Sequence, residues 1–406
     1  MNKMKVSKNG NLILIVILFI TLSSNAQHVS GTLGKGINIA PQDSTFGLNF
    51  SPRFQTTYAG IFDLDSDNYG DVFLIRRARL KFSGFIYNPN IRFKLELGQS
   101  NRDTGGGNAA QFNNTANSLL DAVLKYKFGK GWDFWVGQTK LPGNRQRVVS
   151  SQKMQLVDRS LVNARYNLDR DLGIQLYHKN KLGKGVLNKV VAISMGEGRG
   201  IVTPNIGGYS YTVHIDYLPM GEFTNKGDFI EADLAREPTG KLAIGLTYNF
   251  NDEAGRSRGQ LGDFMLDEFG TQYTSDLSAI FIDLMYKHNG FSLLTEYTIK
   301  ESAATKSGNG IIISTPSGDL KFATGSGFMA QTGYLFKSNY EISGRFTTIT
   351  SDDLVFSSVT NEQEYMIGFS KYIFNNSLKI QTDFSYRDRE FKSNFLQFRL
   401  QMEMTL

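Results

Sequence analysis

Hydrophobic and polar residues alternate along most of this chain. In residues 395–406, Leu396, Phe398, Leu400, Met402, Met404 and Leu406 alternate with Gln397, Arg399, Gln401, Glu403 and Thr405. A strict period of two predicts a β-strand with one apolar and one polar face. The same pattern recurs at 209–218, 241–249 and 377–387.

The alternation predicts sixteen strands in total. They lie at 46–58, 72–86, 90–98, 118–128, 132–138, 171–179, 186–195, 209–218, 241–249, 277–287, 291–300, 327–336, 340–349, 363–373, 377–387 and 395–406. Soluble β-sandwiches, the alternative, also alternate, but they rarely place apolar residues on the outward face of all sixteen strands, because one chain has only one core. The predicted fold is therefore an all-β transmembrane antiparallel β-barrel, for which an even strand number is typical.

The connections alternate between tight turns and long loops, as outer-membrane barrels have short periplasmic turns and long extracellular loops. The long gaps include 59–71 and 139–170. One connection breaks the scheme, because 219–240 should be a short turn but has 22 residues; it could contain a further strand. Pro52 predicts an interruption of the first strand, since proline cannot donate to a strand ladder.

Composition agrees with a β-rich chain and removes several classes of chemistry. The chain has 30 Phe, 18 Tyr and 41 Gly but no Cys, which excludes disulfides, thiolate metal sites and cysteine nucleophiles. Its four His show no metal-ligand spacing, and no nucleophile motif supports a hydrolase. We expect neither an enzyme nor a cofactor.

The N-terminal region has the features of a signal peptide. Lys3, Lys5 and Lys8 precede an apolar run at 12–22, which is too short to span a bilayer, and small residues precede Gln27. We therefore expect a signal peptide at 1–26, a periplasmic linker at 27–44 and a barrel at 45–406. Loss of the signal peptide lowers the net charge from +6 to +3.

A row of cations lies along the second predicted strand, 72–86. Arg77, Arg79 and Lys81 share one face, opposite Ala78 and Leu80. A cation on the lipid face costs about 2–4 kcal/mol at the bilayer centre, so these three should face the lumen. Arg76 then has the wrong parity and should lie at a rim or in a bulge. Arg92 and Lys94 extend the row onto the next strand.

The loop at 139–170 is also strongly basic. It carries seven Lys and Arg against Asp158 and Asp169. It follows the fifth strand, where a loop folded into the pore would belong, so we expect a constriction loop; a solvated surface loop is the alternative. The predicted anion pathway comprises Arg77, Arg79, Lys81, Arg92, Lys94, Lys140, Arg145, Arg147, Lys153, Arg159 and Arg165.

Asp63, Asp65 and Asp67 alternate as the oxygen ligands of a calcium loop do. Asn68 stands at the usual glycine position and Leu74 at the bidentate glutamate position, so the spacing does not fit an EF-hand. An acidic surface loop is the simpler interpretation, with cation bridging to lipopolysaccharide as the alternative.

Three short motifs resemble the phosphate-selective porin O and P family. They are Phe73–Gly84 with its Arg-Arg-Ala-Arg-Leu core, Gly137–Pro142, and Gly173–Leu176. The resemblance implies a sixteen-stranded, usually trimeric porin of the bacterial outer membrane that passes anions, and the cleavage site is similar to those of Bacteroidetes. The chain ends in Leu406 where the family commonly has Phe, and the family's phosphate-pocket lysines have no clear counterparts.

The sequence thus predicts an anion-preferring diffusion porin for small solutes such as phosphate or polyphosphate. A general or carbohydrate-passing porin and a structural or adhesive barrel are the alternatives. Expected partners are small anions, outer-membrane lipid with lipopolysaccharide and, as the family resemblance implies, two further copies of the chain. The basic Arg-Arg-Ala-Arg segment could suggest nucleic acid, but an exported protein does not meet it.

Overall fold

The computed structural model describes residues 28–100, 103, 118–205, 207–303, 313–315, 318–352 and 361–406. The predicted signal peptide lies outside these residues. Among the described residues, no helix combines the length and apolar character needed to cross a membrane.

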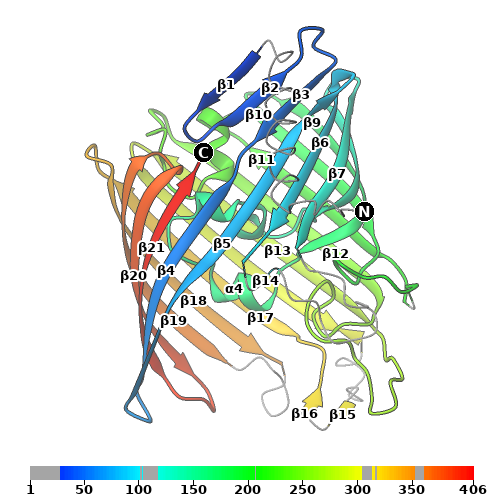
Figure 1. Ribbon diagram of the computed structural model, residues 1–406. Helices are drawn as coiled ribbons and strands as arrows, with labels where there is room; N and C mark the ends of the chain where they lie inside the picture. Colours follow the sequence, from blue (N-terminus) through cyan, green and yellow to red (C-terminus); the bar gives the residue numbers. More distant parts are fainter. Residues whose placement is uncertain are drawn as a thin grey trace, which may run out of the picture.

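Sixteen strands form one closed antiparallel barrel (Figure 1). They are β4 (Arg53–Asp63), β5 (Asn68–Ile86), β6 (Asn88–Gly98), β7 (Leu119–Phe128), β8 (Trp132–Lys140), β9 (Arg170–Leu182), β10 (Gly185–Ser194), β11 (Ser210–Leu218), β12 (Lys241–Ala254), β13 (Ser275–His288), β14 (Phe291–Ser302), β17 (Gly325–Leu335), β18 (Tyr340–Ser351), β19 (Glu362–Phe374), β20 (Leu378–Arg389) and β21 (Phe395–Thr405). The last strand closes the wall on the first, because β21 pairs with β4 from Phe395↔Asp63 to Thr405↔Arg53. The predicted barrel is confirmed.

The alternation of side chains divides each strand between the two faces of the wall. On β21, Leu400 and Met402 are 45% and 46% exposed, whereas Gln401 and Glu403 are 1% and 0% exposed. In a membrane barrel, the apolar side chains face outward into the lipid and the polar side chains face the lumen, where they find hydrogen-bond partners. The period of two therefore fixes which residues can reach the lumen.

Short turns gather at one end of the barrel and longer loops at the other. Between β13 and β14 the turn has only Asn289 and Gly290, both with positive φ (48° and 89°). Two such residues form the hairpin turn that matches the twist of the strands. At the opposite end, the prediction of a long loop at 59–71 is wrong, because β4 and β5 extend through most of this range and leave only a tight turn at 64–67.

The segment at 27–44, expected to be a linker, contains strands β1 (His28–Thr32) and β2 (Gly36–Ala40). They join β3 (Phe46–Phe50), which pairs with the end of β5 from Phe46↔Ile86 to Phe50↔Phe82. Ser51 and Pro52 separate β3 from β4, as predicted for Pro52. The three strands form a small sheet that continues the wall beyond the short-turn end (Figure 1).

Two connections fold into the barrel. The loop between β8 and β9 contains α3 (Arg145–Val148), η2 (Ser151–Lys153) and α4 (Leu161–Arg165). The connection between β11 and β12 contains η3 (Thr224–Phe229) and, within its described residues, no strand. The 22 residues at 219–240 therefore hide no seventeenth strand. A separate pair, β15 (Ile313–Thr315) and β16 (Gly318–Leu320), belongs to the connection between β14 and β17.

Candidate functional site

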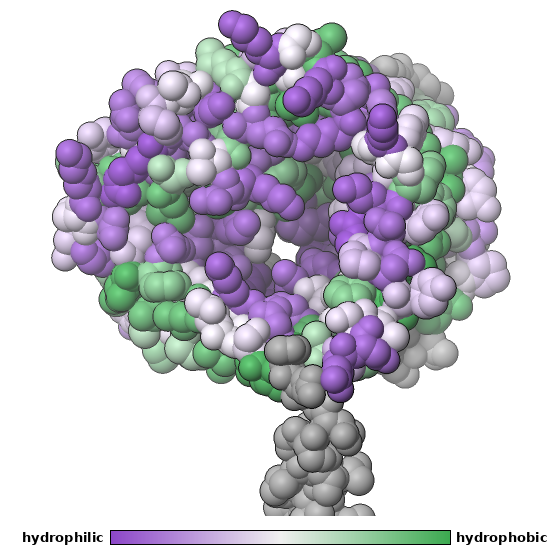
Figure 2. All heavy atoms as spheres, turned by 90° about the horizontal axis from the view of Figure 1, so that it is seen from above, coloured by the Kyte–Doolittle hydropathy of each residue, from purple (hydrophilic) through white to green (hydrophobic). Residues whose placement is uncertain are grey.

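The lumen contains a cavity of about 1590 Å³. Figure 2 looks onto the short-turn end and shows an opening at the centre, rimmed by hydrophilic residues. Among the described residues, the lining contains 21 Lys and Arg side chains and 10 Asp and Glu side chains. The passage is therefore strongly basic.

The loop at 141–169, here called the lumen loop, is fixed to the wall by buried polar contacts. The Arg145 guanidinium donates to Asp283 on β13 and Asp216 on β11, each at 2.5 Å. The backbone N–H of Gln146 donates to Glu296 on β14 at 2.5 Å. All of these groups are less than one-tenth exposed, and buried charges are stable only when paired in this way.

A second set of contacts holds the middle of the lumen loop. The Gln155 amide donates to Glu341 on β18 and Ser292 on β14, each at 2.7 Å. Asp158 accepts from Arg76 at 2.9 Å, Arg77 at 3.0 Å and Arg399 at 3.1 Å. Burial would raise the pKa of Asp158, but the three guanidinium groups hold it well below its ordinary range.

The last turn of the lumen loop packs as an ordinary apolar core inside the barrel. Leu161, Val162 and Tyr166 are buried against inward residues of the wall, including Met285 and Met329. The Tyr166 hydroxyl donates to the backbone carbonyl of Thr324 at 3.0 Å. The half of the lumen on that side is therefore filled, and the cavity lies beside it.

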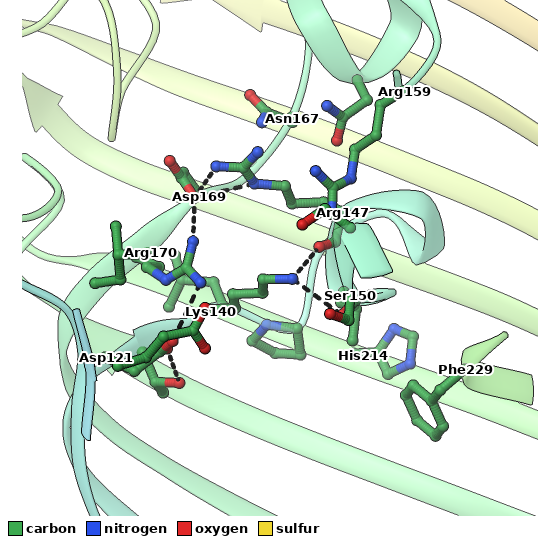
Figure 3. A pocket seen from close by; sticks show the side chains of 18 of the residues that line it. Asp121, Lys140, Arg147, Ser150, Arg159, Asn167, Asp169, Arg170, His214 and Phe229 are labelled. Atoms are coloured by element: carbon green, nitrogen blue, oxygen red, sulfur yellow. Dashed lines mark hydrogen bonds and ion pairs between the residues drawn. The ribbon is translucent and has the colours of Figure 1, made fainter. Parts of the chain in front are cut away.

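Opposite this core, a chain of charges borders the cavity (Figure 3). Arg147 and Arg170 both pair with Asp169, and Arg170 also donates to Asp121 on β7 at 3.1 Å. Lys140 donates to the carbonyl oxygens of residues 147–149, at 2.7 to 3.3 Å. The two ends of the lumen loop are thereby tied to β7 and β8.

The structure places eight of the eleven predicted pathway residues on the cavity lining. They are Arg77, Arg79, Arg92, Lys94, Lys140, Arg147, Arg159 and Arg165. Among the described residues, Lys81, Arg145 and Lys153 do not line it. Arg76 does, because a register shift between β4 and β5 leaves it unpaired in the ladder, as its parity predicted.

Most lining arginines are held by partners. Arg79 pairs with Asp103, Arg92 with Asp133, Arg165 with Glu362, and Arg345 with Glu364. Arg159 has no carboxylate partner among the described residues but donates to the carbonyl oxygens of Gln146 and Val149, each at 2.7 Å. These arginines fix the loop and wall as much as they charge the passage.

Four lining lysines are different. Lys125, Lys127, Lys189 and Lys226 form neither an ion pair nor a side-chain hydrogen bond with any described residue. The prediction missed all four, although Lys125 and Lys127 share the parity of the inward Asp121 and could have been found from it. Lys226 could not, because no pattern places the 219–240 connection in the lumen.

Two aromatic side chains, Trp135 and Tyr177, also line the cavity. Their ring centroids lie 4.3 Å apart, and the Lys125 ammonium lies 3.2 Å from the centre of the Trp135 ring. A cation over an indole face is attracted by the ring quadrupole. This contact orients the Lys125 side chain on the cavity lining.

The suggested calcium ligands do not form a metal site. Asp63 accepts hydrogen bonds from the backbone N–H groups of Asp65 and Ser66, at 3.1 and 2.9 Å, and so caps the β4–β5 turn. Across the described ranges, no three His, Asp or Glu side chains are grouped to hold a metal ion.

Residues 49–394 match the model of the family described as phosphate-selective porin O and P. No curated protein matches the chain. Several solved structures share its fold at low identity. An anion-selective porin from Comamonas acidovorans is 11% identical, with a TM-score of 0.54 over 89% of this chain and 100% of that chain. OmpF of Salmonella typhi, in complex with daunomycin, is 12% identical, with a TM-score of 0.55 over 89% and 98%. OmpT of Vibrio cholerae, in a trimer form, is 9% identical, with a TM-score of 0.51 over 88% and 99%.

Proposed function

Because this chain belongs to the phosphate-selective porin O and P family, and is thus an outer-membrane porin, we propose that its passage prefers small anions. Phosphate and polyphosphate are the candidate solutes. Passage is passive diffusion through the lumen, with no catalytic step.

The observation that carries this proposal is the surplus of cations on the cavity lining, and above all Lys125 and Lys127. A basic, water-filled passage with low-dielectric walls raises the local concentration of anions. Lysine offers a compact point charge, so it attracts phosphate without holding it as firmly as a bidentate arginine would. Weak attraction at several positions suits permeation, since an ion must leave as readily as it enters.

One observation favours a second candidate, a general or carbohydrate-passing porin. Trp135 and Tyr177 provide aromatic surface on the same wall of the cavity. In that case the lysines would contribute little to selection. A plugged structural barrel is less well supported, because the cavity reaches the opening seen in Figure 2.

The zero-current potential of the purified porin in a planar bilayer under a KCl gradient tests the proposal. We expect a potential directed toward chloride equilibrium, and a reduced chloride current when phosphate is added. The double substitution Lys125→Gln with Lys127→Gln should move the potential toward zero. Lys130→Gln serves as the control, since Lys130 is exposed in the β7–β8 turn and does not line the cavity. A cation-directed or zero potential in open channels would support the general porin instead.

We also propose a homotrimer in the outer membrane, with lipid and lipopolysaccharide against the apolar outer face. Trimers recur among porins of this fold, as the trimer form of OmpT illustrates. Light scattering of the detergent-solubilised porin, corrected for bound detergent, should give three times the chain mass. A monomer mass under conditions that keep the channel active would contradict the trimer.

A further inference from the structure

The connection between β11 and β12, residues 219–240, is the one short-turn-end connection that enters the lumen in the described structure; we call it the inward turn. Phe223, Asn225, Lys226 and Asp228 from this turn line the same cavity as the lumen loop. The passage is therefore bordered by two chain segments that enter from opposite ends.

Anchors to the wall hold the inward turn in place. The Lys287 ammonium on β13, only 1% exposed, donates to the carbonyl oxygens of Gly227, Ile230 and Ala232, at 2.8, 2.6 and 2.9 Å. Asp233 accepts from the backbone N–H of Gly290, in the neighbouring turn, at 2.8 Å. A buried ammonium with three carbonyl partners fixes the backbone that accepts from it.

Glu231 joins the inward turn to the lumen loop. Its carboxylate accepts from the backbone N–H of Gln155 at 2.9 Å and from the Gln331 amide on β17 at 2.8 Å. Its own backbone N–H donates to the carbonyl of Lys153 at 3.0 Å. Because Glu231 is 2% exposed, these bonds are made away from water, and the two segments hold each other in position.

The tip of the inward turn is strained and points a cation into the passage. Asn225 and Lys226 have φ of 53° and 56°, a left-handed conformation that costs a non-glycine residue about 1 kcal/mol or more. The Lys226 side chain is exposed and forms no ion pair with a described carboxylate. Lys226 acts electrostatically on Lys153 of the lumen loop: burial, then repulsion by Lys226, lowers the pKa of Lys153, and Asp228 opposes that shift.

We propose that the inward turn is a second selectivity element, at the periplasmic exit, and that Lys226 at its tip sets the attraction of the exit for anions. The inference rests on the proposed anion preference and adds a direction to it. Anions arriving from the periplasm pass Lys226, together with Lys127 and Lys179 near the same short-turn end, whereas anions arriving from outside first pass the lumen loop. The charge of Lys226 should therefore affect anion entry from the periplasmic side more than anion entry from the extracellular side.

The test measures block of the chloride current by inorganic phosphate added to one side of an oriented channel. Since the chain has no cysteine, a Ser66→Cys substitution in the exposed β4–β5 turn, labelled by an impermeant maleimide, identifies the extracellular side. We expect Lys226→Glu to weaken the periplasmic block by about threefold or more, and the extracellular block by less. Lys226→Gln should give an intermediate result and Lys130→Gln no change.

Lys287→Met provides a second variant, which keeps the Lys226 charge but releases the inward turn from the wall. We expect it to weaken the periplasmic block as well and to widen the spread of single-channel conductances. If the parent channel is anion-selective but Lys226→Glu leaves both blocks unchanged, the inference is wrong and the proposed function stands. If the parent channel shows no anion selectivity, the proposed function fails, and the inference fails with it.

Discussion

The Arg145 Nε atom lies 2.5 Å from Oδ1 of Asp283, although 138 positions separate the two residues. One belongs to a loop and the other to the inner face of a strand on the far side of the barrel. Both are nearly inaccessible to water. A contact of this kind makes the lumen loop part of the barrel interior and keeps it away from the outer surface.

Arg145→Met should release the lumen loop. The substitution leaves Asp216 and Asp283 buried without their cation, and loss of one partner of a buried pair costs about 3–5 kcal/mol. We expect a lower urea midpoint for unfolding and a larger, noisier single-channel conductance. An Arg145→Met variant with the conductance and midpoint of the parent would show that the pair does not hold the loop.

Arg77→Gln should affect selectivity less than the Lys125→Gln and Lys127→Gln pair does. The Arg77 guanidinium donates to Asp158 at 3.0 Å and to Gln55 at 2.8 Å, so a carboxylate, which it shares with Arg76 and Arg399, offsets part of its charge. Measured zero-current potentials should rank the two variants in this order. The opposite order would mean that paired arginines govern the passage.

Gly84→Ala should detach the N-terminal sheet and leave the barrel closed. A Cβ at Gly84 would lie 1.7 Å from the backbone oxygen of Gly47 on β3, whereas β4 pairs with another part of β5. Limited proteolysis should then cut within 28–50 while the remaining barrel keeps its heat-resistant migration in gels. Gly70→Ala, with open space around the added atom, is the matched control and should remain uncut.

The packing of the loop after β10 should weaken as the pH rises. Burial raises the pKa of Glu197 from 4.5 to about 7, although the Gly255 N–H and Arg256 oppose the shift. A carboxyl group with a raised folded-state pKa contributes stability that is complete below about pH 4.5 and is lost as the pH rises through about 7. Proteolysis of the long-loop end should therefore accelerate between these values. Glu197→Gln should remove that pH dependence; if the dependence persists, another group is responsible.

The strands were predictable because each one faces lipid and lumen in turn. This constraint is local, so Leu396 to Thr405 display it without knowledge of any partner. It also located the bulge at Arg76, where the parity of the cations changes. The alternation between lipid and lumen ends where the wall leaves the membrane. Gly60, Asp63 and Gly70 lie on strands but show no alternation of apolar and polar residues. The sequence therefore predicted a loop at 59–71.

The interior could be predicted only in part. The basic composition of the lumen loop indicated that it enters the barrel, and its charged side chains do so. Its partners could not be inferred, because Asp283, Glu296 and Glu341 look alike in sequence and become distinct only in the closed wall. The inward turn was evident as an anomaly of length. Its position depends on Lys287, whose partners are backbone carbonyls, and on Glu231, which binds the Gln155 backbone and the Gln331 amide; neither set of partners leaves a sequence signal.

The lumen loop docks on inward residues of β11, β13, β14 and β17 to β20. The cavity, in contrast, is bordered mainly by the arc from β5 to β10. Scaffold and filter therefore overlap at Arg76, Arg77 and Lys140, which line the cavity and also bind the loop, and they are separate at Lys125 and Lys127 on β7, which line the cavity only. Substitutions at Lys125 and Lys127 can change which solutes pass without disturbing the contacts that hold the loop, so this porin could acquire new permeants through a few positions on one strand.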